Sequence, residues 1–193
     1  MNFKQSARLE NVLPESQLLS RILESWDDLA LPNCWLVAGA VTQTYWNHIH
    51  RYPAAYGIKD VDIIYFDPSD VSEAAENDHE NRIARLYGDL DVTFDVKNQA
   101  RVHLWYEQKF GYPISPYATA EAAIATFPTT AGAIGVRRAE RALEFHAPFG
   151  TADLFELIVR PNKVQITRGI YEEKAGRWRS LWPRLKVLDW DDP

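Results

Sequence analysis

The feature that most constrains the fold is the segment 57-GIKDVDIIYFD-67, in which two aspartates precede a run of large apolar residues. β-Branched and aromatic residues dominate that run, which predicts a strand over 60–66. Side chains alternate between the two faces of a strand, so Asp60 and Asp62 share one face and the odd-numbered apolar residues share the other. A carboxylate next to a core is costly unless it is paired or bound to a metal. The segment therefore predicts a chemical role for the aspartates.

Helical and strand patterns alternate along the rest of the chain. This order predicts an α/β (α+β) fold with a small mixed sheet and flanking helices. The length of 193 residues predicts a single domain over 1–193, with helical segments at about 5–29 and about 165–185 packed on it. Further strands are expected at 34–37, 92–96 and 143–146, and helices at 40–50, 71–87 and from Asn98 to about 109.

Composition narrows the classes of protein to consider. The net charge of −6 argues against an extended nucleic-acid footprint, which normally shows as a basic face. The single cysteine excludes a disulfide within the chain and suits a reducing compartment. The first residues have no apolar signal region, and no apolar run reaches the roughly 18 residues needed to cross a bilayer. We expect a cytoplasmic protein that does not enter a membrane.

A third carboxylate lies in the segment 92-VTFDVKN-98. Asp95 alternates with apolar neighbours, so it shares a strand face with Lys97. If this strand lies beside the first one, Asp60, Asp62 and Asp95 meet on one sheet surface. Three carboxylates can hold two magnesium ions, an arrangement suited to phosphoryl chemistry, and Asp95 could take a proton from the acceptor. The alternative is that Asp60 and Asp62 are strand-end residues paired with nearby cations.

The segment 36-LVAGAVTQTYW-46 predicts a strand, a glycine and then a helix. Backbone N–H groups at a helix N-terminus bind phosphate, which makes Gly39 and Ala40 candidate phosphate-binding residues. Lys97 and Arg101 are candidate cations for binding a triphosphate ligand or the acceptor molecule of a phosphoryl-transfer reaction. The alternative for these two is that they only balance the aspartates.

Taken together, Ala38-Gly39-Ala40 before a helix, then 59-KDVD-62, then Asp95 on a second strand resemble the nucleotidyltransferases of the DNA polymerase beta superfamily. The run AGAV…KDVDII is similar to the head domain of CCA-adding enzymes. The runs KDVDIIYFDPSD and FDVKNQARVHLWYEQKFGYPI are more specifically similar to a bacterial family of small nucleotidyltransferase-like proteins, over roughly 33–185. That resemblance implies a fold and a superfamily but no particular substrate.

The resemblance implies transfer of a nucleoside monophosphate from an NTP to an acceptor, with release of pyrophosphate. It implies two magnesium ions, or manganese in their place, at Asp60, Asp62 and Asp95, with Gly39 against the triphosphate. The chain departs from the family pattern at Ala38, which replaces the first glycine of a pair. A nucleotide-binding or sensor module without catalysis and a metal-dependent phosphodiesterase remain as alternatives. The acceptor (a small molecule, a protein or an RNA), the preferred base and the oligomeric state stay open.

Overall fold

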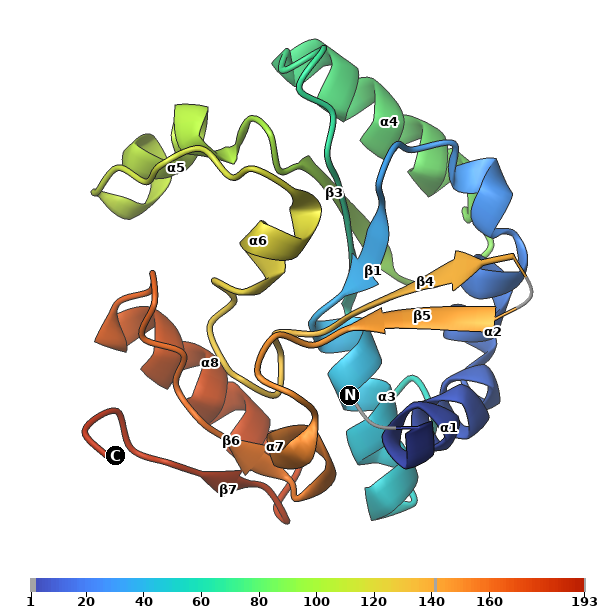
Figure 1. Ribbon diagram of the computed structural model, residues 1–193. Helices are drawn as coiled ribbons and strands as arrows, with labels where there is room; N and C mark the ends of the chain where they lie inside the picture. Colours follow the sequence, from blue (N-terminus) through green and yellow to red (C-terminus); the bar gives the residue numbers. More distant parts are fainter. Residues whose placement is uncertain (1–2, 141, 193) are drawn as a thin grey trace.

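The computed structural model describes residues 3–140 and 142–192 and is built around one five-stranded sheet (Figure 1). The order across the sheet is β3-β2-β1-β4-β5. β2 and β3 are parallel, and the other neighbouring pairs are antiparallel, which confirms the predicted mixed sheet. The strands are β1 (Trp35–Val37), β2 (Asp60–Tyr65), β3 (Thr93–Asn98), β4 (Gly135–Ala139) and β5 (Ala142–His146).

Helices flank the sheet, and a second, two-stranded sheet lies near the C-terminus. The helical N-terminal segment is divided into four pieces, with Pro14 in a short 3-10 turn. No helix within residues 3–140 and 142–192 is long and apolar enough to cross a bilayer. The remaining elements are α1 (Phe3–Val12), η1 (Leu13–Glu15), α2 (Gln17–Glu24), η2 (Trp26–Leu29), α3 (Gly39–His50), α4 (Glu73–Leu86), α5 (Val102–Phe110), α6 (Ala120–Ile124), α7 (Ala152–Phe155), β6 (Ile158–Val159), α8 (Arg168–Leu181) and β7 (Lys186–Val187).

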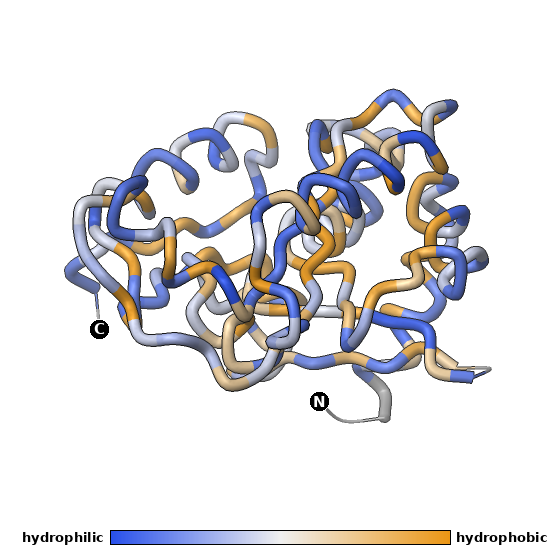
Figure 2. The backbone as a smooth tube through the Cα atoms, turned by 90° about the horizontal axis from the view of Figure 1, so that it is seen from above, coloured by the Kyte–Doolittle hydropathy of each residue, from blue (hydrophilic) through white to orange (hydrophobic). Residues whose placement is uncertain are grey.

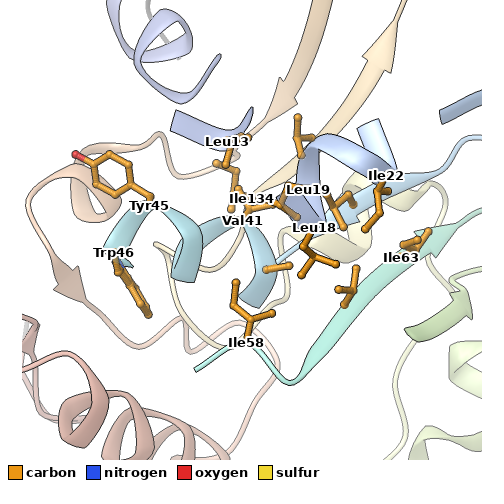
Figure 3. Packing of buried hydrophobic residues seen from close by; sticks show 14 of the residues in the cluster. Leu13, Leu18, Leu19, Ile22, Val41, Tyr45, Trp46, Ile58, Ile63 and Ile134 are labelled. Atoms are coloured by element: carbon orange, nitrogen blue, oxygen red, sulfur yellow. The ribbon is translucent and has the colours of Figure 1, made fainter. Parts of the chain in front are cut away.

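The two faces of the central sheet have different roles. Val61 and Ile63 of β2 are fully buried in the main core, on the face opposite Asp60 and Asp62. Leucines of α1 and α2 and the apolar side of α3 pack in this core (Figure 3). In the hydropathy-coloured tube, hydrophobic and hydrophilic stretches alternate along the chain (Figure 2). The opposite face carries Asp60 and Asp62 together with a smaller buried apolar cluster that includes Trp35, Val37 and Ile64.

The C-terminal segment is part of the core. Tyr171, Ala175 and Trp178 of α8 are buried together with Trp182, at helical spacing. The indole N–H of Trp182 donates to Asn47 Oδ1 on α3 at 2.7 Å. The aromatic stripe of this helix is therefore core packing.

The free edge of β3 is closed by carboxylates of α4. Glu80 Oε2 accepts a hydrogen bond from the backbone N–H of Val96 at 3.2 Å, and Glu76 Oε2 accepts one from Asn98 at 2.7 Å. Such capping protects an edge strand from pairing with another chain. The prediction of a helix starting at Asn98 was wrong: Asn98 ends β3, and its side chain binds the loop carbonyls of Asp67 and Asp70 instead of capping a helix.

Candidate active site

Asp62 and Asp95 are brought together by the pairing of β2 with β3. The parallel register places Asp62 opposite Asp95 and Asp60 opposite Thr93. Register partners on neighbouring strands are about 4.8 Å apart, so the two carboxylates leave the same face side by side. The expected sharing of one sheet surface by the three aspartates is therefore seen in the strand register.

Asp62 and Asp95 line a cavity of about 190 Å³ on the polar face of the sheet. Its walls come from the end of β1, from β2 and β3, from the loop after α6 and from α8. The lining residues besides the two aspartates are Val37, Ala38, Ile64, Lys97, Gln99, Phe127, Pro128 and Lys174. Segments far apart in the sequence thus converge on the two carboxylates.

The local environment raises the pKa of Asp62 from 3.8 to about 6. Burial is the main cause, because it disfavours the charged form. Lys174 opposes the rise, the negative charges of Asp60 and Asp95 add to it, and Lys97 opposes it weakly. A carboxylate in this position gains from any additional cation.

Lys97 supplies the nearest cation to Asp95. Its Nζ lies 2.7 Å from Asp95 Oδ1 and 2.6 Å from Glu80 Oε2 on α4. Burial lowers the pKa of Lys97, but the hydrogen bonds to Asp95 and Glu80 outweigh it and raise the pKa, so the ammonium stays charged. The predicted sharing of a face by Asp95 and Lys97 is confirmed, and the two side chains are in direct contact.

Lys174 of α8 is a second cation in the cavity, and the sequence offers no signal for it. Its Nζ lies 5.4 Å from the centre of the Trp178 ring, within cation–π range. Nothing in the local pattern of α8 indicates that this helix reaches the sheet beside Asp62. Only the tertiary packing of α8 through its buried aromatic stripe brings the lysine there.

The junction between β1 and α3 forms the wall beside Asp62. Ala38 has φ 53° and ψ −118°, a conformation that L-residues rarely adopt and that glycine adopts readily. Gly39 is the first residue of α3, and Ala40 follows in its first turn. A Cβ on Gly39 would lie 2.8 Å from Gln43 Nε2, so this glycine also makes room for a buried side chain.

Two of the predicted site residues lie away from the cavity. Asp60 is exposed at the start of β2 and is not part of the cavity wall. Arg101 is 7% exposed, and its guanidinium forms an ion pair with Glu76 at 2.7 Å and donates to the carbonyl of Val71. The sequence predicted a helix from Asn98, which would place Arg101 one turn inside it. In the structure Arg101 instead immediately precedes α5. Its observed partners are structural.

The donor set of the cavity fits a divalent cation. Within residues 3–140 and 142–192, no three His, Cys, Asp or Glu side chains converge closely enough to enclose a metal ion. Magnesium, however, usually takes only one or two protein carboxylates together with substrate phosphates. Asp62 and Asp95 supply that number of carboxylates at one cavity.

Comparison with known proteins identifies the family. A family model described as "Nucleotidyltransferase" matches residues 24–187. The chain belongs to this nucleotidyltransferase family. The match includes both aspartate strands, the β1–α3 junction and the helix that carries Lys174. No curated protein gives a significant match to this chain.

Solved structures show the same fold. One, described as "The NMR structure of the protein reveals a CCA-adding enzyme head domain", is 23% identical with a TM-score of 0.78, and the match covers 95% of each chain. The Thermotoga maritima CCA-adding enzyme, complexed with tRNA, is 13% identical with a TM-score of 0.53. That match covers 96% of this chain and 42% of the Thermotoga enzyme. These likenesses establish a nucleotidyltransferase head-domain fold.

Proposed function

We propose that the protein transfers a nucleoside monophosphate from an NTP to an acceptor and that this transfer depends on magnesium or manganese. One observation carries the proposal: Asp62 and Asp95 are register partners that line one cavity, next to the start of α3. Bound divalent cations would neutralise the charge that develops on the phosphates during transfer. Asp62 and Asp95 would hold them, with Asp60 joining from the exposed end of β2.

The protein's own groups have separate tasks in this proposal. The first-turn N–H groups of α3, at Gly39 and Ala40, bind the β- and γ-phosphates. Lys97 and Lys174 add positive charge at the same cavity. Arg101 was a candidate for this role, and its partners in the structure favour Lys174 in its place.

The reaction balances without a further reactant. The acceptor oxygen forms a bond to the α-phosphorus, and the bond from that phosphorus to the oxygen bridging to the β-phosphate breaks. Pyrophosphate leaves with the bridging oxygen and its electron pair. Asp95, whose side chain is 50% exposed, takes the proton of an acceptor hydroxyl and passes it to solvent.

Calorimetric titration of each NTP, with and without magnesium, tests the proposal on the wild type and on the double variant Asp60→Ala/Asp62→Ala. We expect magnesium-dependent binding that disappears in the double variant. Asp78→Ala, which removes an exposed carboxylate from α4, serves as control. Binding that is the same with and without magnesium, or the same in the double variant, contradicts the assignment.

A nucleotide-binding module without catalysis is the second candidate. The observation that favours it is the contact of Lys97 with Asp95, since this lysine already neutralises one of the two carboxylates. Measuring pyrophosphate release with mixed small-molecule, protein and RNA acceptors separates the two functions. Magnesium-dependent NTP binding with no release for any acceptor supports the module. Hydrolysis of a phosphodiester in preference to an NTP supports a phosphodiesterase instead.

A further inference from the structure

A second, largely apolar cavity adjoins the cavity lined by Asp62 and Asp95, which we call the acidic cavity. It also has a volume of about 190 Å³, and the two cavities share Lys97, Gln99, Phe127 and Pro128 as wall residues. Small-molecule sites are typically roughly 300–1,000 Å³, so neither cavity alone is large enough for a nucleotide. A ligand of that size needs both, with one part in each.

Aromatic rings from α5, from the loop before α6 and from Phe127 after α6 line the second cavity. Trp105, Tyr106 and Phe110 come from α5, and Tyr117 comes from the loop that leads to α6. The rings of Tyr106 and Phe110 pack 4.5 Å apart. In Figure 1, α5 and α6 lie on the same side of the sheet, beyond the end of β3. Flat aromatic walls favour a flat ligand, because stacked rings bury apolar area with good geometry.

The charges of the two cavities differ. The acidic cavity contains two carboxylates and two lysines. In the wall of the aromatic cavity the charged side chain is Lys97, on the side shared with the acidic cavity. The hydroxyl of Tyr117 donates to Gln165 Oε1 at 2.9 Å and lies 3.0 Å from Thr126 Oγ1, which places amide and hydroxyl groups in an otherwise apolar wall. Away from Lys97, this wall suits a neutral ring system with polar edges.

The direction of the strands orders these features. Asp60 and Thr93 are exposed at one end of the parallel pair, and Asp62 and Asp95 come next along the strands. Gln99, four residues beyond Asp95 along the chain, lies in the wall that the two cavities share. From Asp62 and Asp95, the strand direction therefore leads toward the aromatic cavity and away from Asp60.

We propose that the cavity lined by Trp105, Tyr106 and Tyr117 binds the nucleobase of the NTP. The inference rests on the proposed function, because the triphosphate must occupy the acidic cavity for the base to reach the aromatic one. Trp105 stacks on the base, and the hydroxyl and amide groups of Tyr117 and Gln165 contact its edge. Base selection is thereby assigned to α5 and the loop before α6, while the start of α3 and the metals at Asp62 and Asp95 hold the phosphates.

Trp105→Ala tests the stacking part of the inference, with Leu104→Ala as a matched control. Leu104 is the preceding residue of α5, and it is 59% exposed and outside the cavity wall. Each protein is titrated with the four magnesium NTPs and with magnesium tripolyphosphate, which has no base or sugar. Removing an aromatic stacking partner costs about 1–3 kcal/mol per base, which corresponds to about a 5- to 150-fold loss of affinity.

We expect Trp105→Ala to weaken the tightest-binding NTP by that factor and to leave tripolyphosphate unchanged. Leu104→Ala should change neither. Equal losses for both ligands in Trp105→Ala, or no loss for the NTP, overturn the inference while the proposed function stands. Wild-type protein that binds neither ligand overturns the proposed function and the inference with it.

Tyr117→Phe provides a second test that keeps the ring and removes only the hydroxyl. The wild-type order of affinity for the four NTPs should change in this variant, while the affinity for tripolyphosphate stays the same. An unchanged order overturns the assignment of the Tyr117 hydroxyl to the base edge. Thermal unfolding of each variant confirms that it is folded before titration.

Discussion

Asp62 of β2 lies directly opposite Asp95 of β3 in a parallel register, and both carboxylates line the same cavity. The pairing places two like charges side by side where burial already disfavours them. The structure keeps Asp95 in contact with Lys97. Lys174 lowers the pKa of Asp62, but by less than burial raises it.

The first prediction concerns the stability of Asp62→Asn as a function of pH, without metal. The folded protein raises the pKa of Asp62 to about 6, so below about pH 4 the residue is protonated in both folded and unfolded states. Between about pH 4 and pH 6 the unfolded state loses this proton while the folded state keeps it, so the free energy of unfolding falls across that range and then levels off. Asn avoids this loss, so the variant should be more stable than wild type by about 2 to 3 kcal/mol at pH 7.5, with a smaller difference at pH 4.

Urea unfolding at pH 4, 6 and 7.5 in the presence of EDTA measures this difference. Asp78→Asn, which removes an exposed carboxylate from α4, is the control. The same pH dependence in both variants contradicts the burial argument for Asp62. In the presence of magnesium and NTP, the order should reverse, because wild type gains binding free energy that Asp62→Asn lacks.

The second prediction concerns Ala38→Gly. Ala38 has φ 53° and ψ −118°, where a Cβ is strained, and such positions cost of order 1–3 kcal/mol. Glycine removes the strain but loses more conformational entropy on folding. We expect a net stabilisation of about 1 kcal/mol, measured by urea unfolding.

Ala40→Gly, two residues later in the first turn of α3, is the matched control. Ala40 is 1% exposed and helical, so glycine there should destabilise the protein by at least about 0.5–1 kcal/mol. Opposite signs for the two substitutions are the expected result. Destabilisation by both would show that the backbone at Ala38 is not strained.

The sequence predicts the local features of the site well. Alternation along 60–66 assigns Asp60 and Asp62 to one face and the odd-numbered apolar residues to the other, and the structure confirms both faces. The same argument correctly pairs Asp95 with Lys97 on one side of β3. These features depend only on the two-residue period of a strand, which a single sequence shows directly.

The sequence does not predict features that depend on tertiary contacts. That β2 and β3 are neighbours follows from strand pairing across the intervening α4, which no local pattern encodes. Lys174 reaches the cavity because α8 packs through its aromatic stripe, and Arg101 is held by Glu76 instead of facing a ligand. The positive φ of Ala38 could not be predicted from the sequence, because alanine rarely adopts a positive φ.

The third prediction concerns Lys97→Met and its effect on metal binding. Lys97 contacts both Asp95 and Glu80, so a divalent cation at Asp95 competes with this ammonium. A partly exposed ion pair is worth up to about 1 kcal/mol, so its removal should raise the affinity for manganese alone by a few-fold. The affinity for magnesium NTP should fall, because Lys97 also contributes charge to the phosphates.

Lys186→Met, which removes the same charge from exposed β7, controls for the change in net charge. Calorimetry with manganese and then with magnesium NTP measures both effects. Unchanged manganese affinity in Lys97→Met would mean that the metal does not use Asp95. An NTP affinity that rises with the manganese affinity would leave Lys97 with no role toward phosphate.

The fourth prediction separates the structural part of this region from the catalytic part. Glu76 of α4 is buried, forms the ion pair with Arg101 and accepts the backbone N–H of Asn98 at the edge of β3. Replacing one member of a buried ion pair leaves an uncompensated charge, which typically costs about 3–5 kcal/mol. Glu76→Gln should therefore lower the free energy of unfolding by that amount, whereas Glu73→Gln, exposed on the same helix, should change it by less than about 0.5 kcal/mol. If Glu76→Gln instead kept wild-type stability and lost NTP affinity, Arg101 would belong with the phosphate-binding residues after all.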